Sequence, residues 1–170
     1  IAQDLGEDRD SPLYERVIIG ENKKTKYRCI TIDTIKTGLD KTNFFGTFTK
    51  TQIKEDGTLY LGNNNATYEI VLPFLKECLN HLKEALIEQW EQGEEGDGIL
   101  TINASINSLL RLLGDIIDHL KGVKNINTKG SKLQDLVTHT IYYLDPVIRF
   151  FQNLSEEDRE DLRKGYGIAG

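Results

Sequence analysis

The sequence predicts a mainly α-helical protein, a helical bundle of three to four long helices with a small N-terminal mixed region that contains a β-hairpin. Two observations predict this fold. From residue 66 onward, apolar residues recur every three or four positions, which is the period of an amphipathic helix. Before residue 65, the apolar runs are short and rich in β-branched residues. We therefore expect a mixed α/β segment over residues 1–65, which continues a domain that begins upstream, and a helical domain over residues 66–170.

The N-terminal segment predicts paired strands and one short helix. Residues 17–19 and 27–32 are apolar and β-branched, and the polar loop between them indicates a hairpin-like connection. Asp33 is the expected N-cap of a short helix that ends near Leu39. The Glu-Asp-Gly sequence at residues 55–57 indicates a second turn with strand-like flanks.

The first long helix is indicated by an apolar stripe that runs through one face. The stripe consists of Val71, Leu75, Cys78, Leu82, Leu86 and Trp90. Pro73 removes one backbone donor and clashes with the carbonyl four residues earlier, so the helix either begins close to it or kinks there. The acidic, glycine-rich residues 93–98 end this helix in a loop.

The following helices are delimited by capping signals. Residues 106–120 carry a wide apolar face that includes Leu113, and Gly122 ends this helix. The Ser-Lys-Leu-Gln sequence at residues 131–134 matches a capping box and opens the next helix. Asp145 and Pro146 resemble an N-cap and N1 pair and indicate that the segment breaks or kinks there and restarts toward Leu154. A second capping box at residues 155–158 opens an acidic terminal helix that ends at Gly165.

Composition and charge exclude several classes of protein. No apolar run approaches the roughly 20 residues of a spanning helix, and the acidic first ten residues are unlike a signal peptide. Cys29 and Cys78 are expected to be buried thiols of a reducing compartment. We therefore expect a soluble cytoplasmic protein without a membrane partner. The net charge of −6 disfavours a stand-alone nucleic-acid binder. The absence of methionine indicates a piece of a longer chain.

No catalytic set, cofactor site or metal site can be assembled from these residues. Residues 165–170 match GxGxxG, but they follow a helix, whereas a dinucleotide site places this motif before one. His81, His119 and His139 lie on three separate predicted helices, and no pair has the spacing of metal ligands. We expect surface or capping roles for these histidines, and neither a metal nor a cofactor.

The densest basic group lies in the loop and second strand of the predicted hairpin. It consists of Lys23, Lys24, Lys26 and Arg28, with Tyr27 among them. Such a group can contact a phosphate backbone, and a solvated hairpin tip has the same composition. Both interpretations remain open on the sequence alone.

A succession of short motifs resembles a known family. Asp-Ser-Pro-Leu-Tyr-x-Arg-Val stands at residues 10–17, and Leu86 precedes Trp90 by four positions. Gly-Ile-Leu-Thr-x-Asn at residues 98–103 precedes Leu-Leu-Arg-Leu-Leu at residues 109–113. Further matches are Asp-Pro-Val-Ile, Leu154 with Arg159, and a Tyr-Gly pair near the end. This order resembles the C-terminal half of DGQHR-domain proteins, the family that includes the DNA sulfur modification protein DndB.

The resemblance implies a role in prokaryotic DNA-modification or defence loci. DndB-like members are linked to DNA phosphorothioate modification and its transcriptional control. The Asp-Gly-Gln-His-Arg motif of the family lies in its N-terminal half, is similar to a motif of ParB-like proteins that handle nucleotides and DNA, and is absent here. No residue of that motif can therefore be assigned to a position in this sequence.

Three functions follow as hypotheses. The first is a scaffold and assembly region of a DGQHR-type protein, which contacts DNA mainly through its N-terminal half. In this hypothesis the protein can assemble as a homo-oligomer. The second is a nuclease or nucleotide hydrolase whose site is shared between the halves, with Arg111 and Asp115 lining a possible cleft. The third is a protein–protein interaction module that binds no nucleic acid.

Overall fold

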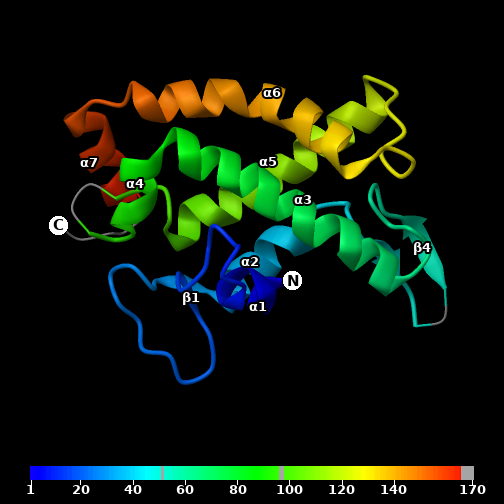
Figure 1. Ribbon diagram of the computed structural model, residues 1–170, viewed down its shortest axis with the longest axis horizontal. Coiled ribbons are helices and arrows are strands. Elements are labelled where there is room, and N and C mark those ends of the chain that lie inside the picture. The colour runs from blue at the N-terminus through cyan, green and yellow to red at the C-terminus, as the bar shows by residue number, and fades with distance from the viewer. Residues whose placement is uncertain (51, 96–97, 166–170) are drawn as a thin grey trace.

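The computed structural model describes residues 1–50, 52–95 and 98–165. Within these ranges the chain is mainly helical with short strands, as predicted (Figure 1). The elements are α1 (Ala2–Glu7), β1 (Val17–Ile18), β2 (Ile30–Thr31), α2 (Ile32–Asp40), β3 (Gly46–Phe48), β4 (Ile53–Asp56), α3 (Asn64–Ala85), α4 (Ile87–Gln92), α5 (Asn103–Gly122), α6 (Leu133–Gln152) and α7 (Glu156–Gly165). Among the helices of the described part, none is long and apolar enough to cross a bilayer.

The three long helices pack on one another and on the N-terminal elements. α3 contacts α6, and α5 contacts both α6 and α2. In Figure 1, α6 lies along one edge of the molecule, α1, α2 and β1 lie toward the opposite edge, and the β3–β4 pair projects at one end. This arrangement makes α3 and α5 the centre of the molecule.

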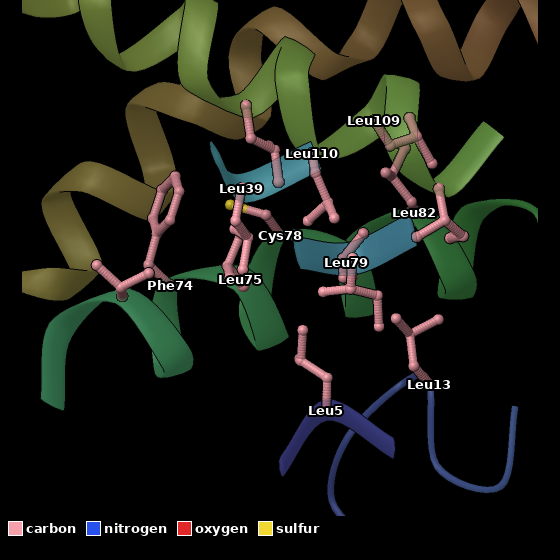
Figure 2. Packing of buried hydrophobic residues seen from close by; sticks show 14 of the residues in the cluster. Leu5, Leu13, Leu39, Phe74, Leu75, Cys78, Leu79, Leu82, Leu109 and Leu110 are labelled. Carbon is pink, nitrogen blue, oxygen red and sulfur yellow. The ribbon is translucent and has the colours of Figure 1, made fainter. Parts of the chain in front are cut away.

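A single hydrophobic cluster joins the N-terminal segment to the helical region. Leu5 and Leu13 pack beside leucines of α3 and α5, and all of them are buried (Figure 2). The buried stripe of α3 and the apolar face of α5 agree with the sequence prediction, and Leu113 is fully buried. Residues 1–65 and 66–170 therefore share one core.

The strand pairing differs from the predicted hairpin. β1 and β2 run parallel, with Val17 opposite Ile30, so the long loop between them returns the chain to the same end of the pair. The antiparallel pair is β3 with β4, in which Gly46 lies opposite Asp56. The residues predicted as a turn, 55–57, therefore include the end of a strand rather than a turn between strands.

Two helix starts also differ from the prediction. The N-cap of α2 is Thr31, whose hydroxyl accepts a hydrogen bond from Thr34 N at 3.1 Å, and Asp33 lies inside the first turn. The N-cap of α6 is Lys132, because the Ser131 hydroxyl donates to the Asn127 carbonyl at 2.8 Å instead of capping the helix. The second difference arises because the Asn127 carbonyl offers the Ser131 hydroxyl a competing hydrogen bond.

Proline does not break the helices. Pro73 lies inside α3 and Pro146 inside α6, so the restart predicted at Asp145 is wrong. Buried residues on both sides, Leu144 and Ile148 in α6, hold the helix against the core and offset the missing backbone bond. The predicted helix through Trp90 is instead divided at Leu86, whose φ of −132° and ψ of 38° are not helical.

The terminal helix begins and ends as predicted and is fastened to the loop after α4. The Ser155 hydroxyl accepts from Asp158 N, and Ser155 N donates to the Asp158 carboxylate, both at 3.1 Å, which is the expected capping box. The largely buried Arg163 donates to the Gly98 carbonyl at 2.7 Å. Figure 1 shows α7 beside α4, which agrees with this bond.

Candidate functional site

The motif at residues 10–17 forms a tightly bonded turn after α1. The Ser11 hydroxyl donates to the Leu5 carbonyl at 2.6 Å and accepts from Leu13 N at 3.2 Å, and all three residues are buried. The turn is therefore fixed to α1 by a side chain and to the core by Leu13.

Two further motif segments, those of Trp90 and Thr101, bond to the same region. The fully buried Trp90 donates from Nε1 to the Pro12 carbonyl at 3.1 Å. The Thr101 hydroxyl donates to the Trp90 carbonyl at 2.7 Å, and the Cys29 thiol to the Thr101 carbonyl at 3.3 Å. We call Pro12, Cys29, Trp90 and Thr101 the Trp90 junction. It links four segments that are far apart in sequence.

Asn103 fastens the start of α5 to the start of α2. Its side-chain oxygen accepts from Thr31 N at 2.9 Å and from the Thr34 hydroxyl at 2.7 Å. Thr31 is the N-cap of α2 and also bonds Thr34, so the first turns of both helices share one polar network. Asn103 belongs to the same short motif as Thr101, and both of these polar residues have structural partners.

A cleft of about 700 Å³ lies beside the Trp90 junction. We call it the Arg16 cleft. Its walls come from the turn after α1, the loop before β2 and the adjoining ends of α3 and α4. The lining includes four cationic side chains, two tyrosines and two glutamates: Arg9, Arg16, Arg28, Lys83, Tyr14, Tyr27, Glu15 and Glu91.

Glu91 holds two of the cations in place. The Arg16 guanidinium is bonded to the Glu91 carboxylate and donates to the Glu91 carbonyl at 3.3 Å. Lys83 Nζ lies 3.6 Å from the other carboxylate oxygen of Glu91. Arg16 is only 8% exposed, so this pairing orients a largely buried charge.

A backbone carbonyl holds the side chain of Arg28 in the same cleft. Its Nε donates to the Glu15 carbonyl at 3.1 Å, and its backbone N donates to the Thr25 hydroxyl at 2.8 Å. Glu15 has a φ of +58°, a left-handed conformation that is uncommon for a residue other than glycine. Glu15 N donates to the Gly6 carbonyl at 3.1 Å, which fixes this conformation against α1.

The structure divides the predicted basic group. Lys24 Nζ lies 2.9 Å from the Glu94 carboxylate and Lys26 Nζ 3.7 Å from that of Glu95. Lys23 is exposed, and Arg28 is the member of the group that lines the Arg16 cleft. Two of the four charges are therefore paired with the acidic loop after α4.

The same acidic loop binds Tyr27. The Tyr27 hydroxyl hydrogen-bonds the Glu95 carboxylate, which raises the pKa of Tyr27 and lowers the pKa of Glu95. Gly93, with a φ of +62°, allows the loop to approach closely, and Glu94 N donates to the Lys26 carbonyl at 2.7 Å. The acidic loop thus supports the loop before β2, which carries Arg28.

The other candidate residues lie outside this cleft. Arg111 and Asp115 are exposed one turn apart on α5. The His119 ring packs edge-on against Tyr143, and the His139 ring bonds the Asp135 carbonyl. Within the part of the chain that the structure describes, no group of histidine, cysteine and acidic residues can hold a metal ion. All but the first residue of the GxGxxG sequence lies outside the described residues.

Both cysteines are buried thiols, as predicted. Burial raises the pKa of Cys29 to about 11 and raises the pKa of Cys78 as well. A thiol with a raised pKa is a poor nucleophile at neutral pH, because the thiolate is the reactive form. The structure therefore gives these cysteines packing roles.

Sequence reasoning missed Arg9, Lys83 and Glu91 as members of one site. Lys83 and Glu91 read as exposed helix residues, and only the packing of α3 and α4 on the turn after α1 brings them to Arg16. The available signal was Arg16 within the motif at residues 10–17, which lines one part of the cleft but does not indicate which residues of α3 and α4 contact it.

Comparison of the chain with protein-family models, with curated proteins and with solved structures found no match in any of the three.

Proposed function

We propose that this chain is the helical C-terminal part of a DGQHR-type, DndB-like protein of prokaryotic DNA-modification or defence loci. In this role it is a scaffold and assembly region for the N-terminal half, which makes the main contact with DNA.

The observation that carries this proposal is the Trp90 junction. The motifs behind the family resemblance stand apart in the sequence, yet Trp90 is hydrogen-bonded to both Pro12 and Thr101 in the core. Motifs that form one bonded unit are expected to occur together, because each polar group is buried and needs its partner. This link supports treating them as one structural signature.

The charge distribution supports a scaffold more than a broad DNA-binding face. The chain carries a net charge of −6, and Lys24 and Lys26 are paired with Glu94 and Glu95. A protein that neutralises many phosphates needs free cations along its contact surface.

The test has two parts. The gene should encode Asp-Gly-Gln-His-Arg upstream of the codon for Ile1. The full-length protein should bind duplex DNA with an affinity whose logarithm falls linearly with the logarithm of salt concentration. A gene without that motif upstream would overturn the family assignment, and a full-length protein without salt-dependent DNA affinity would overturn the DNA role.

A further inference from the structure

We propose that the Arg16 cleft binds the phosphate group of a nucleotide, with Arg28 and Lys83 as direct contacts and Arg16 as the residue that positions the site. This inference goes beyond the scaffold role and does not depend on it, because it rests only on the residues that line the cleft.

The local charge of the cleft is opposite to that of the molecule. Four cationic and two anionic side chains line it, a net excess of two positive charges on a chain whose net charge is −6. A concave surface with an excess of one sign of charge attracts ions of the opposite sign. A multiply charged anion is therefore the ligand that this cleft favours.

The cations are positioned before any ligand arrives. Glu91 fixes Arg16 and lies within 3.6 Å of Lys83, while the carbonyl of Glu15 fixes Arg28 through its Nε. The Nε bond leaves the terminal nitrogens of Arg28 to approach an anion as a fork, and among the described residues these nitrogens have no hydrogen-bond partner. Such preorganisation reduces the entropy that binding costs.

The left-handed Glu15 is a second, independent indication. Non-glycine residues in this conformation are strained, and they are concentrated at binding and catalytic sites. In this protein the carbonyl of Glu15 accepts the hydrogen bond that orients Arg28. The strain therefore lies at the residue that orients the proposed phosphate contact.

The size and the aromatic lining indicate more than a bare phosphate ion. The volume of about 700 Å³ lies within the range of small-molecule sites. Tyr14 and Tyr27 line the same cleft and can contact a base, since base–aromatic stacking tolerates any sequence. The shared chemistry is a phosphate monoester beside a base, supplied by a free mononucleotide or by the 5′-phosphorylated end of a DNA strand.

The experiment is a calorimetric titration of inorganic pyrophosphate into the protein and into three variants at constant ionic strength. Arg28→Gln and Lys83→Gln should each weaken binding about tenfold or more, because each removes a charge-assisted hydrogen bond. Lys36→Gln removes the same charge from the exposed face of α2 and should leave the affinity unchanged. Circular dichroism establishes that each variant is folded, and the buried Arg16 is left intact.

Absence of saturable pyrophosphate binding, or equal affinities for all three variants, would overturn the proposal. A second series identifies the source of the phosphate by comparing a nucleoside 5′-monophosphate with an oligonucleotide that carries either a 5′-phosphate or a 5′-hydroxyl. If the ligand is the end of a DNA strand, the 5′-phosphorylated oligonucleotide should bind more tightly than the mononucleotide. The oligonucleotide with a 5′-hydroxyl should then lose that affinity. If the ligand is a free nucleotide, the mononucleotide should bind at least as tightly as the oligonucleotide.

Discussion

Trp90 connects distant segments through both its ring and its backbone. Trp90→Phe keeps an apolar ring but removes the donor to the Pro12 carbonyl, which becomes an unpaired buried acceptor beside a small cavity. We expect a loss of about 2–4 kcal/mol in the free energy of unfolding. Urea denaturation measures it, with Tyr142→Phe as control, because Tyr142 is 72% exposed and its loss should stay within about 0.5 kcal/mol. Equal midpoints for the two variants would contradict this role.

The backbone at Glu15 offers a second test at the residue scale. Glycine adopts a φ of +58° without steric cost, whereas a β-branched residue is strained there. Glu15→Gly should therefore leave the free energy of unfolding unchanged or raise it by up to about 1 kcal/mol. Glu15→Val should lower the free energy of unfolding by about 1–2 kcal/mol. Thermal unfolding of both variants checks the order. If valine is tolerated as well as glycine, the left-handed conformation is not required.

Single residues of the cleft were predictable only where local sequence marked them. Arg28 belongs to the basic group and was a candidate contact on the sequence alone, whereas Arg16 appeared only as part of the motif at residues 10–17. Lys83 and Glu91 lie on separate helices and carry no local signal. Their function depends on a tertiary contact, which charge patterning along the chain does not encode.

At the scale of elements, the buried face of α5 is the strongest prediction from the sequence. Leu113 is fully buried in the cluster between the long helices, so Leu113→Ala removes contacts that the core cannot refill. We expect a loss of about 2–5 kcal/mol in the free energy of unfolding. Leu112→Ala is the matched control on the adjacent, half-buried position and should cost distinctly less. A loss below about 0.5 kcal/mol for Leu113→Ala would place the core on another face.

Helical periodicity predicted the buried helix faces correctly, because a periodic apolar stripe reflects packing against the core. The helix break predicted at Pro146 and the hairpin predicted for β1 and β2 were wrong. Pro146 has a real cost in α6, but Leu144 and Ile148 anchor the helix on either side of it. The β1–β2 pair is parallel because its connecting loop returns along the molecule, which no turn residue indicates. In both cases tertiary contacts outweigh the local preference.

At the scale of the whole molecule, the segments on either side of residue 65 behave as one unit with a shared core. The carboxylates of Asp8 and Glu95 join these segments at the surface. Lys76 Nζ donates to the Asp8 carboxylate at 2.8 Å, which ties the end of α1 to α3 and lowers the pKa of Asp8. The Tyr27 hydroxyl lowers the pKa of Glu95, and the Ser155 hydroxyl lowers the pKa of Asp158. Each bond stabilises the ionised carboxylate in the folded state.

These shifts predict a loss of stability in acid. Because the folded pKa values lie below the unfolded values of about 4, the unfolded state binds more protons as the pH falls. The stabilisation is complete well above pH 4 and declines from about pH 5 downward through the folded pKa values. Urea midpoints measured at pH 7, 5, 4 and 3 should therefore fall progressively below pH 5. A constant midpoint over this range would contradict the prediction.

The variant Asp8→Asn tests the contribution of the Asp8–Lys76 ion pair separately from those of the other carboxylates. It should lower the midpoint at pH 7 and then show a shallower decline, so that its curve approaches that of the unmodified protein as the pH falls through the lowered folded pKa of Asp8. Glu84→Gln removes an exposed carboxylate from the same helix and serves as control. Parallel curves for Asp8→Asn and the unmodified protein would mean that the bond to Lys76 does not couple protonation to folding. Convergence would show that a surface ion pair joins the N-terminal segment to the helices, as the shared core does from within.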